Sequence, residues 1–95
     1  MSERLIAIDP GPTQSAYVVM RDGKPIESGK RENHELNVKI VRGRWHEFRH
    51  MAIEMVASYG MAVGEEVFET CLWIGRFIQT FGEEHTKLRR HEIKS

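Results

Sequence analysis

The feature that most constrains the fold is a run of four apolar residues, 5–8, that ends in Asp9 and the breaker cluster Pro-Gly-Pro at residues 10–12. A short apolar run bounded by turn residues is typical of a buried strand, and it predicts a first strand over residues 4–9. A carboxylate at such a strand end needs a cation or donors beside it, because burying an unpaired anion is costly. Asp9 is therefore a candidate metal-holding or phosphate-facing residue, although an Asp here also commonly caps the turn through its own backbone.

A second short apolar run, residues 51–56, carries one acid, Glu54. A lone Glu inside a buried strand is rare unless it is paired or acts as a ligand. If the two apolar strands pair side by side, Asp9 and Glu54 come together. Magnesium is usually held by one or two carboxylates together with water and substrate phosphate. The two runs therefore predict a divalent-metal site at the ends of adjacent strands.

The composition bounds these hypotheses. A chain of 95 residues predicts one domain over residues 1–95, and 14 basic against 14 acidic side chains give no whole-chain electrostatic footprint for nucleic acid. A nucleic-acid function must therefore rest on local patches. The single cysteine, Cys71, forbids an internal disulfide and a cysteine-rich zinc site, which indicates a reducing, cytoplasmic setting. We find neither an apolar run long enough to span a membrane nor an export signal.

The first thirty residues predict an antiparallel meander. Residues 15–20 read as a second strand and residues 25–30 as a third, because the Asp22-Gly23 pair between apolar runs is a strong hairpin signal. The start of the second strand then lies close to Asp9, which brings the hydroxyls of Thr13 and Ser15 near the predicted site. These hydroxyls can bind phosphate or water, but satisfying the turn backbone is the interpretation that we favour.

A helix is predicted over residues 34–47, with Asn33 as its N-cap and a break near Gly43. This region and the residues just after it hold the densest basic patch of the chain: Lys39, Arg42, Arg44, His46, Arg49 and His50. The patch suits contact with a phosphate backbone, yet the solvated face of an amphipathic helix explains it equally simply, and we favour that interpretation. The strand at residues 51–56 then pairs in parallel with the first strand through a crossover connection. Tyr59, just beyond it, is a candidate to stack on a base or ribose.

Residues 63–81 predict the longest helix, because apolar side chains cover more than half of its circumference. The apolar positions are Val67, Phe68, Cys71, Leu72, Trp73, Ile74, Phe77, Ile78 and Phe81. A helix this apolar in a small domain lies between layers or meets a partner. We interpret Cys71 as a packing residue and Gly82 as the end of the helix. Residues 83–86 are predicted to connect it to an exposed, basic edge strand over residues 87–95.

The order of these elements and two short motifs resemble the RuvC-like Holliday-junction resolvases, a family of the RNase H-like nuclease superfamily. Ile8-Asp9-Pro10-Gly11 closes the first strand, a hairpin and a helix follow, and Ala52-Ile53-Glu54 stands in the later strand. In element order the resemblance covers nearly the whole chain. It implies an α/β, RNase H-like mixed sheet, with an antiparallel meander of three strands, then parallel strands, and packed helices.

The resemblance also implies an activity. RuvC-like proteins are metal-dependent endonucleases that act on branched DNA in recombination and repair, with Mg²⁺ or Mn²⁺ as cofactor. Asp9 and Glu54 match two of the family's carboxylates and are expected to be catalytic and metal-binding. The candidate nucleic-acid contacts are Thr13, Ser15, Tyr59, Arg42 and Arg44. The family's helix comparable to residues 63–81 contributes to a homodimer interface, where Trp73 and Phe77 are expected if they are not core.

Two features depart from the family pattern. Ala57 stands where the family often has an aromatic residue, so Tyr59 is a candidate substitute. The family's further carboxylates on a C-terminal helix have no counterpart, so we expect a domain that lacks this helix and holds one magnesium ion weakly. A non-catalytic remnant that binds nucleic acid or protein is therefore the alternative hypothesis. An actin-like phosphate-binding fold is a third, but it needs a second, similar domain that this length excludes.

Overall fold

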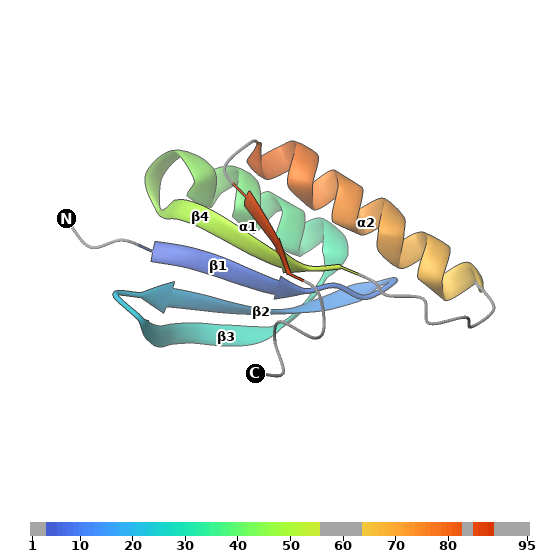
Figure 1. The fold of residues 1–95 in the computed structure, drawn as a ribbon, viewed down its shortest axis with the longest axis horizontal. Helices are drawn as coiled ribbons and strands as arrows, with labels where there is room; N and C mark the ends of the chain where they lie inside the picture. The colour runs from blue at the N-terminus through green and yellow to red at the C-terminus, as the bar shows by residue number, and fades with distance from the viewer. Residues whose placement is uncertain (1–3, 56–63, 83–84, 89–95) are drawn as a thin grey trace.

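The computed structural model describes residues 4–55, 64–82 and 85–88, and these residues form five strands and two helices (Figure 1). In chain order the elements are β1 (Arg4–Asp9), β2 (Gln14–Arg21), β3 (Lys24–Glu32), α1 (Asn33–His46), β4 (Phe48–Glu54), α2 (Glu65–Phe81) and β5 (His85–Leu88). No helix in this described part of the chain is long and apolar enough to cross a membrane.

The strands form one mixed sheet in the order β3-β2-β1-β4-β5. β1 and β2 pair antiparallel, as do β2 and β3, whereas β4 pairs in parallel with both β1 and β5. The predicted α/β class, with a three-stranded meander followed by parallel strands, is confirmed. The parallel pairing follows from the crossover through α1, which returns the chain to the end where β1 begins.

The hairpin between β2 and β3 has the predicted two-residue turn. Asp22 and Gly23 both have positive φ angles, 50° and 81°. This is the backbone of a type I′ turn, whose twist matches that of the flanking strands and which favours Asp-Gly. The local sequence therefore determined the turn and the pairing beside it, whereas the register of the rest of the hairpin shifts by one residue between Val19 and Met20.

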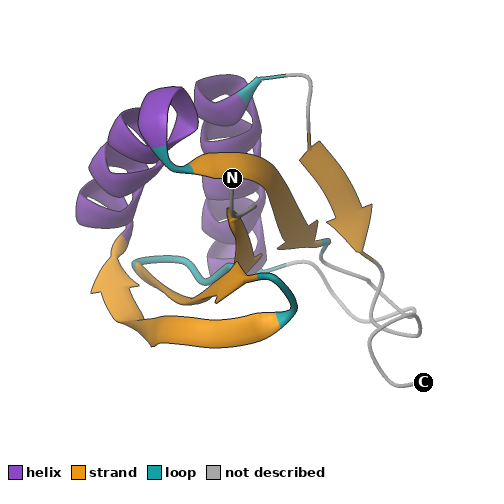
Figure 2. Ribbon diagram, turned by 90° about the vertical axis from the view of Figure 1, so that its left-hand side faces the viewer, coloured by secondary structure: helices purple, strands orange, loops and turns teal. Residues whose placement is uncertain are grey.

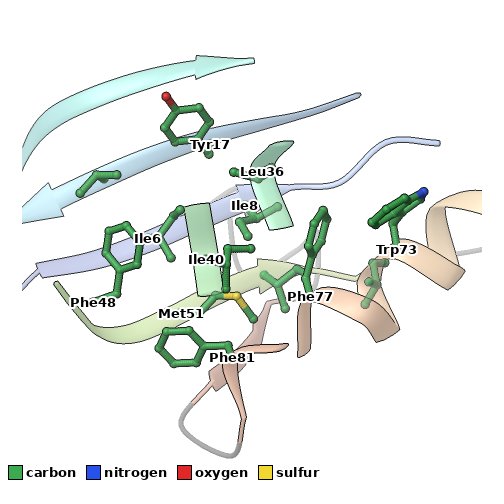
Figure 3. Close-up of a cluster of buried hydrophobic side chains, with 13 residues drawn as sticks. Ile6, Ile8, Tyr17, Leu36, Ile40, Phe48, Met51, Trp73, Phe77 and Phe81 are labelled. Carbon is green, nitrogen blue, oxygen red and sulfur yellow. The ribbon is translucent and has the colours of Figure 1, made fainter. Parts of the chain in front are cut away.

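Both helices pack on the same face of the sheet (Figures 1 and 2). The side chains that point from the central strands toward the helices are buried, and they include Ile6, Ile8, Val19, Met51 and Ile53. Leu36 and Ile40 of α1, together with Trp73, Phe77 and Phe81 of α2, complete this core (Figure 3). Burial of an apolar side chain stabilises the fold by about 1.5–3 kcal/mol, so this single layer carries most of the stability.

Helix α1 departs from the predicted helix at its N-cap and at Gly43, and the strand after it begins earlier than predicted. Its N-cap is Glu32, whose carboxylate accepts from the backbone N–H of His34, so Asn33 is not the cap that we expected. The helix runs unbroken through Gly43, where a Cβ would overlap the ring of Phe48. Phe48 itself belongs to β4, which begins three residues earlier than predicted. Val41, on the other side of this helix from the buried Leu36 and Ile40, is exposed.

Helix α2 matches its prediction closely and ends at Gly82, whose φ of 101° suits glycine. Trp73 and Phe77 are core residues rather than interface residues, whereas Cys71 is exposed and does not pack as predicted. His85 and Thr86 were predicted to lie in a connector but belong to β5. The part of the predicted edge strand over residues 89–95 lies outside the described residues.

Candidate metal centre

Asp9 and Glu54 end two neighbouring parallel strands. The register of β1 and β4 pairs Ala7 with Ala52 and Ile8 with Ile53, so the next residue on each strand is the carboxylate. Side chains alternate between the two faces along a strand, and neighbouring strands lie about 4.8 Å apart. Ile8 and Ile53 point into the core. Both carboxylates therefore lie side by side on the opposite face, the one that no described helix covers.

A shallow hollow of about 390 Å³ lies on this open face. Its lining residues are Ala7, Ile8, Asp9, Ala16, Tyr17, Val18, Ala52, Glu54 and Leu88. Small side chains at Ala7, Ala16 and Ala52 form the floor and leave room above the sheet. Asp9 and Glu54 are the two charged groups among these lining residues, so the hollow pairs an apolar floor with a carboxylate rim.

The environment of Asp9 differs from the one inferred from the sequence. Asp9 is exposed rather than buried, and Glu54 is half-buried. An exposed carboxylate is hydrated and needs no compensating cation for stability. The argument that burial alone demands a partner for Asp9 is therefore wrong. What makes the pair notable is that two carboxylates stand next to each other at the ends of paired strands.

The two carboxylates fit a hard divalent cation. Magnesium takes oxygen ligands and commonly keeps several waters while one or two carboxylates hold it. Asp9 and Glu54 supply such ligands from rigid strands. The described residues contain no group of three or more acidic, histidine or cysteine side chains able to hold a metal ion. The donor set in this part of the chain is thus consistent with one weakly held ion.

Ser15 lies beneath the loop that follows Asp9. Its side chain is 1% exposed and both of its hydrogen bonds are internal. The hydroxyl accepts from the backbone N–H of Gly11 at 3.1 Å and donates to Oδ1 of Asn33 at 2.6 Å. Ser15 therefore satisfies the turn, as the favoured interpretation of the sequence has it, and its burial corrects the alternative expectation that it contacts phosphate. Thr13, in contrast, is exposed in the same loop and stays a candidate contact.

The two arginines predicted to contact nucleic acid lie at the other end of the sheet. Arg44 donates from Nη1 to the backbone carbonyl of Thr80 at 2.6 Å, near the end of α2. Arg42 lines a separate hollow on the α1 side, which also contains Glu35 and Glu47. The structure does not bring either arginine to Asp9, because α1 begins near the carboxylates and runs away from them. Their contact with DNA stays a prediction, and Tyr59 lies outside the described residues.

A polar cluster that the sequence did not indicate links β2, β3 and α1. Tyr17 donates its hydroxyl proton to Glu27 at 2.7 Å and accepts from Nε of Arg31 at 3.1 Å. Lys39 forms an ion pair with Glu27 at 3.0 Å. The hydrogen bond from Tyr17, followed by that from Lys39, lowers the pKa of Glu27 below its ordinary value. The hydrogen bond to Tyr17 raises the pKa of Arg31.

The fold can be compared with known proteins. No protein-family model matches the chain, and no curated protein sequence matches it. Among solved structures, RuvC of Thermus thermophilus in complex with a Holliday junction substrate is similar, with a TM-score of 0.73 and 11% identity, over 97% of this chain and 68% of that one. A second Thermus thermophilus RuvC structure is similar with a TM-score of 0.72 and 12% identity, over 96% of this chain and 66% of that one.

These similarities define the fold and its extent. The chain spans about two thirds of the length of the two RuvC structures. At 11–12% identity the likeness concerns the path of the backbone, not the identity of site residues. The five-stranded mixed sheet with two helices on one face is the α/β, RNase H-like fold of RuvC, and this is the conclusion that the comparisons establish for the chain.

Proposed function

We propose that this chain is a Holliday-junction resolvase-like, metal-dependent endonuclease domain that hydrolyses phosphodiester bonds in branched DNA, in a cytoplasmic setting. The single observation that carries the proposal is the juxtaposition of Asp9 and Glu54 at the ends of adjacent parallel strands, on the rim of one hollow. The RuvC-like fold supports it, since the RuvC of one similar structure is in complex with a Holliday junction substrate.

In the proposed mechanism Asp9 and Glu54 would hold Mg²⁺ or Mn²⁺. The ion would supply Lewis-acid chemistry for the hydrolysis of a phosphodiester. The paired strands keep the backbones of Asp9 and Glu54 in register.

The DNA-binding part of the proposal rests on the residues around this rim. Thr13 is exposed two residues beyond the Pro10-Gly11 turn and is the described residue best placed to donate to a phosphate near Asp9. Tyr59 is a further candidate from the sequence. Arg42 and Arg44, at the opposite end of α1, are proposed to contact only a distant arm of a branched substrate. Zero formal net charge indicates that binding depends on such local contacts.

A homodimer through α2 is also part of the proposal. Phe68 and Leu72 are 63% and 51% exposed and lie one helical turn apart, on the side opposite the buried Trp73 and Phe77. Gly75 continues this stripe and leaves open space beside the helix. A second copy packed here buries both large side chains, which otherwise face water at a cost. Two copies also present two carboxylate pairs, as cleavage of a symmetric four-way junction requires.

The proposal is tested by cleavage of a labelled four-way DNA junction with and without Mg²⁺. We expect magnesium-dependent cutting by the wild type, with more than tenfold weaker cutting by Asp9→Asn and by Glu54→Gln. A matched control is Asp22→Asn, which removes a carboxylate from the distant hairpin. Absence of cutting by a folded wild-type protein at high Mg²⁺ and Mn²⁺ concentrations contradicts the proposed activity.

A non-catalytic role is the second candidate function. The observation that favours it is that two carboxylates, rather than three or more, gather at the site within the described residues. A remnant of this kind binds the junction without cutting it, and binding is then unaffected by Asp9→Asn. Gel-shift measurements beside the cleavage assay distinguish the two functions, because a nuclease loses cutting in the variant whereas a binding module loses nothing.

The dimer is tested by sedimentation. We expect the wild type to sediment as a dimer and Leu72→Glu to sediment as a folded monomer, because the new charge faces water on the free helix. Gln79→Glu, on the same side of α2 but beyond the apolar pair, serves as a control. A monomeric wild type at high concentration contradicts this part of the proposal and leaves the carboxylate site unaffected.

A further inference from the structure

A closed ring of hydrogen bonds lies directly beneath the loop that follows Asp9. Gly11 donates its N–H to Ser15, Ser15 donates to Oδ1 of Asn33, and Nδ2 of Asn33 donates back to the carbonyl of Gly11 at 3.0 Å. The backbone N–H of Asn33 also donates to the carbonyl of Thr13 at 2.9 Å. One side chain thus joins the loop after β1, the start of β2 and the first residue of α1.

The ring is built into the interior rather than laid on the surface. Asn33 is fully buried and Ser15 is 1% exposed. A buried amide costs free energy unless its donor and acceptor groups are hydrogen-bonded. Here Oδ1 of Asn33 accepts from Ser15, and Nδ2 donates to the carbonyl of Gly11. Fully satisfied networks of this kind hold the backbone in one arrangement, because any movement leaves a buried polar group without a partner.

The shape of the loop depends on the same contacts. A Cβ at Gly11 would overlap the backbone carbonyl of Gln14, so the chain turns back on itself tightly at this point. Proline at positions 10 and 12 provides no backbone N–H of its own. The loop therefore cannot be held by its own backbone donors at these two positions. Asn33 holds the loop through its carbonyls: the side chain donates to the carbonyl of Gly11, and the backbone N–H donates to that of Thr13.

We propose that Asn33 is a positioning residue for the metal centre: through its side-chain bonds to Gly11 and Ser15 it fixes the loop that follows Asp9, and with it the direction of the Asp9 carboxylate and the position of the exposed Thr13. The inference rests on the proposed function for its metal. The ring of hydrogen bonds among Gly11, Ser15 and Asn33, called the clasp below, does not depend on a metal. Ser15 is the second member of the clasp. Without it, Asp9 keeps its place in β1, while the chain beyond it, and with it the carboxylate, samples several orientations.

The experiment measures Mn²⁺ affinity by titration, using the paramagnetic signal of the free ion, on the full chain. We expect Asn33→Ala to raise the Mn²⁺ dissociation constant roughly tenfold, as losses of supporting contacts around metal ligands do. Asn33→Asp keeps the acceptor for Ser15 but faces the Gly11 carbonyl with an oxygen, and is expected to weaken binding as well. Ser15→Ala is expected to behave like Asn33→Ala, and Ser15→Thr, which keeps the hydroxyl, to bind as the wild type does.

Two controls separate positioning from general destabilisation. Phe81→Leu removes packing at the far end of α2 and is expected to lower the melting temperature while the Mn²⁺ affinity stays unchanged. Hydrogen exchange of the Gly11 amide, followed by NMR without metal, reports the clasp directly. We expect exchange at least tenfold faster in Ser15→Ala than in the wild type, and unchanged exchange in Phe81→Leu.

Each outcome decides a different point. If Asn33→Ala and Ser15→Ala bind Mn²⁺ as tightly as the wild type, the positioning role is overturned. Unchanged Gly11 exchange in Ser15→Ala overturns the clasp itself. If the wild type shows no Mn²⁺ binding that Asp9→Asn removes, the proposed function fails, and the exchange data still establish or reject the clasp.

Discussion

The two faces of the sheet are made by the same strands and yet have opposite characters. On the covered face, β1 presents Ile6 and Ile8, which are almost completely buried beneath the helices. On the open face, the same strand presents Ala7, which is half-buried, and Asp9, which is exposed. β4 repeats the pattern, with Ile53 inside and Glu54 outside. The alternation of side chains along a strand lets one short segment serve both faces.

The difference shows how a chain of this size separates stability from chemistry. Large branched and aromatic side chains fill the covered face, where each methylene removed from water stabilises the fold. The open face holds alanines and two carboxylates that are exposed or half-buried, so it contributes less to stability. A site of this kind tolerates variation in its own residues only because the opposite face of the same strands holds the fold together.

The largest expected effect tests the covered face. Phe77 is fully buried at the centre of the core (Figure 3), so Phe77→Ala is expected to lower the free energy of unfolding by about 3–5 kcal/mol. Val18→Ala, on the open face, is expected to cost less than about 1 kcal/mol because its side chain is partly exposed already. Urea denaturation measures both. Equal losses contradict the comparison and indicate that the open face is covered in solution.

A smaller effect distinguishes two helical glycines: Gly43, which is packed against a neighbouring side chain, and Gly75, which is exposed. A Cβ at Gly43 would overlap the ring of Phe48, so Gly43→Ala is expected to cost about 1–3 kcal/mol through overpacking. Gly75 has open space around it, so Gly75→Ala is expected to stabilise α2 by up to about 1 kcal/mol through helix propensity. Thermal unfolding of the two variants should therefore shift in opposite directions; shifts of the same sign contradict the packing that we describe.

The open face is tested by removing one of its charges. Asp9→Asn is expected to change the free energy of unfolding by less than about 0.5 kcal/mol in the absence of metal, because Asp9 is exposed. The same variant is expected to lose the increase in melting temperature that Mn²⁺ gives the wild type. Calorimetry with and without the ion measures both effects. A destabilised Asp9→Asn protein points instead to a capping role for Asp9 in the turn.

The smallest effect concerns the polar cluster at the edge of the covered face. The hydrogen bond from Tyr17 lowers the pKa of Glu27, so Glu27 stabilises the fold above its unfolded pKa, and this contribution is lost as the pH falls through the lowered folded pKa. Because Glu27 is partly exposed, we expect Glu27→Gln to cost only about 0.3 kcal/mol at pH 7. Urea midpoints of the two proteins should converge as the pH falls through the lowered pKa of Glu27. A difference that grows on acidification contradicts this assignment.

Several features could be inferred from short stretches of sequence. The hairpin at Asp22-Gly23, the buried strand before Asp9 and the long helix before Gly82 each follow from patterns within a few residues. The pairing of Asp9 with Glu54 required one further step, the rule that a strand, a crossover helix and a second strand lie parallel. Local propensity and this topological rule together placed the candidate site.

Other features depended on contacts between distant residues. Asparagine is a residue type that commonly caps helices. In the folded chain, however, Asn33 is buried and its side chain hydrogen-bonds to Gly11 and Ser15. Gly43 was expected to break α1, yet the ring of Phe48 occupies the space that its missing side chain leaves. Neither outcome is visible from sequence spacing, since each depends on which side chain another element brings close.

The sequence by itself determined the strands, the tight turn, the long helix and the identity of the paired acids, because periodicity and breaker residues act over short distances. Only the tertiary structure decided that Trp73 and Phe77 face inward while Phe68 and Leu72 face outward, because an apolar helix does not specify which stripe the sheet will bury. It also decided that Asp9 is exposed. Burial is a property of the whole packed layer, and no segment determines it alone.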